Sequence, residues 1–117
     1  MIFITQSPDK AITAFVEEAV ILLSQNNLDD FIDKFDYSAL NKSDLYIALR
    51  YGKEKNKPVI IDNPCYVPFQ QRILKTQCGY ELYCDLYTYG KINGLTLEVD
   101  FITDKDMFYV ILAEIHY

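Results

Sequence analysis

The amino-acid sequence predicts a single α+β domain, residues 1–117, in which N-terminal helices pack on an antiparallel sheet of four to five strands. In the helical part, residues 7–52, apolar residues recur at three- and four-residue spacing, as on one face of a helix. In the sheet part, residues 59–117, apolar and polar residues alternate, as in strands with one buried face. The chain has 117 residues, of which 50% are hydrophobic, and this is enough for one core. Helices followed by antiparallel strands are typical of the α+β class.

The first helix is predicted to start at Ser7 and to be largely buried. Ser7 suits the N-cap, Pro8 suits the first helical position, and Asp9 is favourable near the positive end of the helix dipole. Residues 25–27 end the pattern. The residues on the apolar face are Ile12, Phe15, Val16, Ala19, Val20 and Leu23.

Two shorter helices are expected next. Asn27 can cap the second helix, and residues 36–38 are predicted to form a turn after it. Either Asn41 or Ser43 can cap the third helix, with Gly52 just past its end. The three helices together supply the apolar layer that covers the sheet.

Strands are predicted at residues 59–61, 80–89, 95–103 and 107–117, the last three as an antiparallel meander. Residues 69–76 suit a fifth strand, although residues 70–74 also tolerate a helical turn. Asn93-Gly94 favours a tight hairpin and places the turn at residues 90–94, between the strands 80–89 and 95–103. The last strand is apolar on both faces, which leaves its register open. Its two faces carry Val110 and Leu112 on one side and Ile111, Ala113 and Ile115 on the other.

The outward face of the last strands combines acids with tyrosines. Tyrosine offers a large contact area with little loss of rotamer entropy, and carboxylates add charge complementarity. This pattern predicts a partner-binding surface, unless a helix covers the face or the tyrosines only form cross-strand pairs. The predicted surface residues are Glu81, Tyr83, Asp85, Tyr87, Tyr89, Glu98 and Asp100.

The charge of the chain favours a basic partner. Its net charge is −6, which disfavours nucleic acids and anionic membranes because phosphates repel it. The N-terminal residues have no basic segment followed by a long apolar run, so no signal peptide and no membrane helix are predicted. Three irregularly spaced cysteines favour reduced thiols and a cytoplasmic location.

No catalytic motif is found in the sequence. His116, the only histidine, could exchange a proton with Glu114, but a polar residue at the end of a strand is the simpler interpretation. Cys65, Cys78 and Cys84 could bind zinc together with His116, yet they lack a C-x-x-C pair. The acids of residues 29–36 lack the spacing of a calcium loop. We therefore predict no catalytic residue, no metal site and no cofactor.

Three short segments resemble parts of a small uncharacterised bacterial α+β domain. They are residues 85–88 (Asp-Leu-Tyr-Thr), 93–98 (Asn-Gly-Leu-Thr-Leu-Glu) and 114–117 (Glu-Ile-His-Tyr), with Tyr87 where the family has tryptophan. In size, charge and composition, the whole chain also resembles the small acidic immunity proteins of bacterial toxin systems, including contact-dependent growth inhibition. That resemblance implies inhibition of one cognate toxin domain, for instance a basic nuclease, by covering its active site.

Two other functions remain open. A half-cone of the cystatin or NTF2 type could hold a pocket between the helices and the sheet, and an NTF2-like protein of this kind would bind or convert a small molecule. Alternatively, the tyrosine-rich face could be buried in a homodimer. The leading prediction is a non-enzymatic protein that binds a basic protein through its sheet face.

Overall fold

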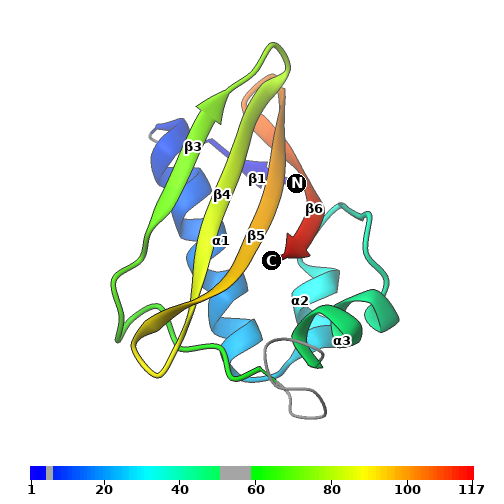
Figure 1. The fold of residues 1–117 in the computed structure, drawn as a ribbon. Coiled ribbons are helices and arrows are strands. Elements are labelled where there is room, and N and C mark those ends of the chain that lie inside the picture. Colours follow the sequence, from blue (N-terminus) through cyan, green and yellow to red (C-terminus); the bar gives the residue numbers. More distant parts are fainter. Residues whose placement is uncertain (5–6, 51–58) are drawn as a thin grey trace.

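The computed structural model describes residues 1–4, 7–50 and 59–117 and confirms the α+β class (Figure 1). The three helices in these residues are α1 (Pro8–Ser24), α2 (Leu28–Asp33) and α3 (Lys42–Arg50). The predicted N-caps of α1 and α2 are confirmed. Ser7 Oγ accepts a hydrogen bond from the Lys10 amide at 3.2 Å, and Asn27 Oδ1 accepts one from the Asp30 amide. Asn41, rather than Ser43, caps α3 and exchanges two hydrogen bonds with Asp44. The position expected for Gly52 lies outside the described residues.

The strands form one six-stranded sheet of order β1-β6-β5-β4-β3, with β2 paired to β6 as well. From β3 to β6 the sheet is an antiparallel meander; it was expected for the last three strands, and β3 extends it. Figure 1 shows it as a curled sheet with α1 lying behind β3, β4 and β5. The strands are β1 (Ile2–Phe3), β2 (Tyr37–Ser38), β3 (Gln71–Lys75), β4 (Gly79–Thr88), β5 (Lys91–Asp104) and β6 (Met107–His116).

The two shortest strands were not expected: β1 precedes the predicted helical part, residues 7–52, and β2 lies within it. Ile2 pairs with Phe108 in the antiparallel sense, and Tyr37 pairs with Ile111 in the parallel sense, so β1 and β2 follow one another along the same edge of β6. The predicted turn at residues 36–38 is therefore partly a strand. A strand of two residues is too short to show alternation in the sequence.

The strand predicted at residues 59–61 is not formed. These residues contribute single backbone bonds instead: the Val59 amide donates to the Leu49 carbonyl at 2.6 Å, and the Asp62 amide to the Tyr87 carbonyl at 2.8 Å. Ile61 is only 4% exposed. Ile60, in contrast, is 50% exposed, so within this apolar run Ile61 is the buried residue, and it is buried without sheet pairing.

The hairpin turn between β4 and β5 lies at Tyr89-Gly90, at the start of the turn predicted over residues 90–94 and not at its signal, Asn93-Gly94. Both turn residues have positive φ, 50° and 79°, as a tight turn between twisted strands requires. Asn93-Gly94 lies inside β5, where the register with β4 shifts and Gly94 has a φ of 90°. The dipeptide thus forms part of a β-bulge. Both a bulge and a tight turn accommodate glycine with a positive φ, so the sequence Asn-Gly alone does not distinguish between them.

The core lies between α1 and the inner face of the sheet. Phe15 of α1 makes edge-to-face contacts with Phe35 and Phe101, at ring-centroid distances of 5.3 and 5.7 Å, and Phe101 contacts Phe108 at 5.5 Å. Such pairs stabilise a core by about 0.5–1.5 kcal/mol beyond the burial of their area. No helix in the described residues is long and apolar enough to cross a membrane.

Candidate functional site

The candidate site is the face of the sheet that points away from α1. Leu82 and Cys84 of β4 and Val99 of β5 are fully buried on the inner side, while the residues between them are half-exposed. Because side chains alternate along a strand, the side chains of these intervening residues point away from α1, which lies behind the sheet in Figure 1. We call this surface the acidic face; it comprises Glu81, Tyr83, Asp85, Glu98, Asp100 and Glu114.

The strand register places like charges directly opposite one another on the acidic face. Glu81 of β4 pairs with Asp100 of β5, and Glu98 of β5 pairs with Glu114 of β6. Like charges in such positions destabilise a sheet. Partial burial, together with the charges of Glu81 and Glu98, raises the pKa of Asp100 above its ordinary value. The fold therefore maintains an arrangement of carboxylates that opposes its own stability.

Tyr83 lies at the centre of the β4 part of this face. Its hydroxyl donates to Glu81 Oε2 at 3.1 Å, and this bond is the largest cause that raises the tyrosine pKa. Arg72 of β3 lies opposite, with its guanidinium carbon 5.4 Å from the ring centroid. An open depression of about 370 Å³ is lined by Arg72, Tyr83 and Asp85 together with residues 69–71. The face thus offers an aromatic ring with polar groups on both sides of it.

A bulge in β6 brings that strand's polar end onto the acidic face. Glu98 pairs with Glu114, whereas the next residue, Val99, pairs with Leu112, so Ala113 is the extra residue. The predicted face for Ile115 is therefore wrong: Ile115 is buried on the same side as Val110 and Leu112. After the bulge, the side chains of Glu114 and His116 point outward. Strict alternation from Val110 and Leu112 would have placed both of them on the inner face.

His116 interacts with Glu98 of the neighbouring strand. Its Nε2 lies 2.7 Å from Glu98 Oε1, and its Nδ1 lies 2.9 Å from the main-chain oxygen of Tyr117. Both nitrogens face acceptors, so the charged ring, with two donors, satisfies both. The bond to the Tyr117 main chain and then that to Glu98 raise the histidine pKa. The sequence suggested Glu114 as the partner, and the pairing with Glu98 could only be found from the register of β5 and β6.

Two predicted surface residues do not belong to the acidic face. Tyr87 is only 7% exposed, at the end of β4 where the chain around Asp62 bonds to the strand backbone. Tyr89 is 77% exposed but lies in the hairpin turn, with a positive φ. Tyr87 is thus buried where a segment distant in the sequence bonds to β4, and Tyr89 lies in the turn that follows the strand. The structure does bring together the other five predicted residues.

The other candidates for metal ligands are separated in the structure. Cys65 and Cys78 are exposed, while Cys84 is buried in the core, where loss of solvation raises its pKa to about 12 and keeps it a thiol. Asp29 forms an ion pair with Lys42 at 2.9 Å. Within the described parts of the chain, the group whose donor atoms converge is Glu98, Glu114 and His116, all within 4.8 Å of one another.

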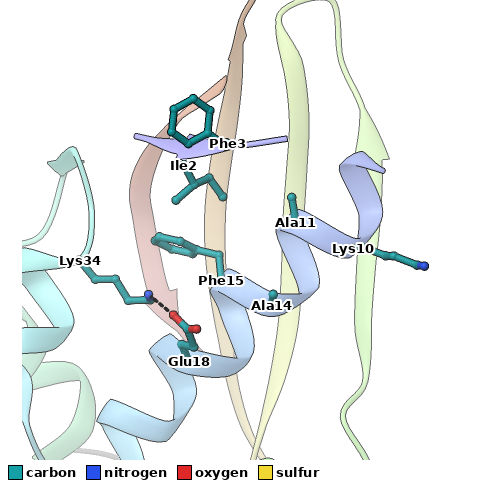
Figure 2. Close-up of a pocket in the computed structure, with 8 residues that line it drawn as sticks. All are labelled: Ile2, Phe3, Lys10, Ala11, Ala14, Phe15, Glu18 and Lys34. Carbon is teal, nitrogen blue, oxygen red and sulfur yellow. Dashed lines mark hydrogen bonds and ion pairs between the residues drawn. The ribbon is translucent and has the colours of Figure 1, made fainter. Parts of the chain in front are cut away.

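A shallow groove lies on the opposite side of the molecule, between β1 and α1 (Figure 2). Its volume is about 400 Å³, and Ile2, Phe3 and Phe15 form its apolar part. Lys34 crosses one end, with its Nζ 2.6 Å from Glu18 Oε2 and 4.5 Å from the centroid of the Phe15 ring. The groove is open, and below it the apolar core fills the space between α1 and the sheet.

Comparisons with protein-family models, with curated proteins and with solved structures found no match for this chain.

Proposed function

We propose that this protein binds a basic protein partner through its acidic face and performs no chemistry on it. The observation that carries the proposal is the register of the sheet, which sets Glu81 against Asp100 and Glu98 against Glu114. A fold gains no stability from like charges placed directly opposite each other. A partner with Lys and Arg side chains would relieve this repulsion, and so the arrangement favours association with a cationic surface.

The most concrete form of this proposal is an immunity protein that neutralises one cognate bacterial toxin domain. Many toxins act on nucleic acids and have a basic cleft for the phosphates, which is the surface that an acidic inhibitor would cover. Long-range attraction would speed association, and the packed ring of Tyr83 would slow dissociation. The net charge of −6 acts in the same direction.

The geometry gives less support to an NTF2-like protein with an internal pocket. Such a pocket would need polar side chains to point between the helices and the sheet. In the described residues that space holds Phe15, Phe101 and Phe108, which are 0–4% exposed, whereas the acids and His116 lie on the other face. For this reason protein binding is the function that we favour.

The direct test reverses the charge of three acids on the face, Asp85, Glu98 and Asp100, by substitution with lysine. The binding partner to use is the polypeptide encoded immediately upstream of this chain, titrated calorimetrically at several salt concentrations. We expect the affinity to fall at least about a hundredfold, because each desolvated charge pair contributes a few kcal/mol. The salt dependence of the affinity should become flatter as well.

A matched control reverses three exposed acids elsewhere, Asp33 in α2 and Asp104 and Asp106 at the turn between β5 and β6. Both triple variants change the net charge by the same amount, so only the position of the charges differs. Circular dichroism checks that each variant is folded. Equal affinities for the two variants would mean that the acidic face is not the binding surface.

A further inference from the structure

We infer that Glu98, Glu114 and His116 form a binding site for a divalent transition-metal ion of the zinc type. One donor atom from each side chain lies within 4.8 Å of the other two. In a tetrahedral site with metal–ligand bonds of about 2.0–2.2 Å, donor atoms lie about 3.3–3.6 Å apart. The three side chains therefore need only small rotations to coordinate one ion.

The backbone determines this convergence. Glu98 and Glu114 are direct partners across β5 and β6, and the bulge at Ala113 turns Glu114 and His116 outward together. In a regular strand, the burial of Val110 and Leu112 would require Glu114 to point inward. The three ligands thus stand on two hydrogen-bonded strands rather than on a loop, which holds their relative positions.

The histidine is oriented as a metal ligand requires. Its Nδ1 lies 2.9 Å from the main-chain oxygen of Tyr117, the last residue, which can only accept, so Nδ1 keeps its proton. The Nε2 atom then faces Glu98 Oε1 at 2.7 Å. A carboxylate or backbone carbonyl oxygen on the second ring nitrogen is the usual support of a metal-bound histidine, because it fixes the tautomer. A metal ion would replace the Nε2 proton and bind both Nε2 and the carboxylate.

The ligand set selects the class of metal. One imidazole and two carboxylates suit zinc and its neighbours, whereas calcium and magnesium prefer oxygen ligands alone. Glu114 is exposed and the side chain of His116 is 37% exposed, so the ion would retain water at its open positions. A dication would also offset the repulsion between Glu98 and Glu114, and this gain does not depend on a protein partner.

The test titrates zinc ions into the chain by calorimetry, without a polyhistidine tag. The exposed thiols would compete for zinc, so the parent protein carries Cys65→Ser and Cys78→Ser. We expect one ion per chain with a micromolar dissociation constant. His116→Gln and Glu98→Gln should each weaken binding at least about tenfold, since loss of even a supporting residue has this effect.

Glu81→Gln is the matched control, because it removes the same charge from the same face but no ligand. It should leave the zinc affinity within about twofold of the parent, as for an independent site. Circular dichroism and the zinc-induced shift of the His116 ring signals in NMR verify the fold and the ligand. The inference is overturned by the absence of binding at millimolar zinc, by equal affinity in His116→Gln, or by calcium binding as tightly as zinc.

Discussion

At the scale of single residues, Asp100 shows how the acidic face opposes stability. Its raised pKa has two causes, partial burial and the carboxylates of Glu81 and Glu98. The folded state therefore binds the proton of Asp100 more tightly than the unfolded chain does. The contribution of Asp100 to stability is therefore highest below its pKa in the unfolded chain, about 3.9, and is lost as the pH rises through its folded pKa.

The corresponding prediction is that Asp100→Asn stabilises the protein at neutral pH. The gain should be about 0.2–1 kcal/mol, the usual cost of like charges in cross-strand pairs. It should disappear below the pKa of the unfolded chain, where both proteins are uncharged at this position. Urea unfolding at a series of pH values measures the difference. Asp104→Asn, at an exposed turn residue, serves as the control, and a loss of stability in Asp100→Asn would contradict the account of this face.

At the scale of elements, what the sequence could predict depended on the length and regularity of each segment. The helix α1 was found because its cap, Ser7, and its apolar periodicity agree over 17 residues. The strand β4 was found in the same way from its alternation. In contrast, β1 and β2 have two residues each, and their pairing with β6 is visible only in three dimensions.

The segment around Asp62 and the bulge in β6 limited the prediction of the candidate site. Alternation correctly placed Glu81, Tyr83, Asp85, Glu98 and Asp100 on one face, because this stretch of β4 and β5 is regular. It failed for Tyr87, which is buried where the chain around Asp62 bonds to β4, and for the end of β6, where an additional residue reverses the face of the residues that follow. No periodic pattern encodes that change, so His116 could not be paired with Glu98.

Gly79, at the start of β4, provides a test at this scale. A Cβ atom at this position would lie 1.9 Å from the carbonyl oxygen of Phe101 on β5, closer than any real contact. Gly79→Ala should therefore force the two strands apart and lower the free energy of unfolding by about 3 kcal/mol or more. Chemical denaturation measures this. Gly90→Ala is the comparison, because a Cβ atom added at Gly90 meets nothing within 4 Å. If Gly90→Ala lowers the free energy of unfolding as much as Gly79→Ala does, backbone strain rather than the contact with Phe101 is responsible.

At the scale of the whole molecule, the charge distribution predicts how copies of the chain interact. Two acidic faces repel each other, and the net charge of −6 adds to this repulsion. We therefore expect a monomer of 13.6 kDa at neutral pH and low salt, measured by gel filtration with light scattering. A dimer that dissociates when Asp85 is replaced by lysine would contradict the expectation and favour self-association through this face.

The position of β6 within the sheet also constrains the order in which the protein can form. It is the last strand in the sequence, yet β5 pairs along one edge of it and both β1 and β2 pair along the other. During synthesis β1 emerges about a hundred residues before its partner residues in β6, and β2 about seventy residues before them, at roughly 5–20 residues per second. Residues 2–3 and 37–38 therefore stay unpaired for several seconds after they are synthesised. Their pairing with β6 closes the longest loops in the chain and is the final step of folding.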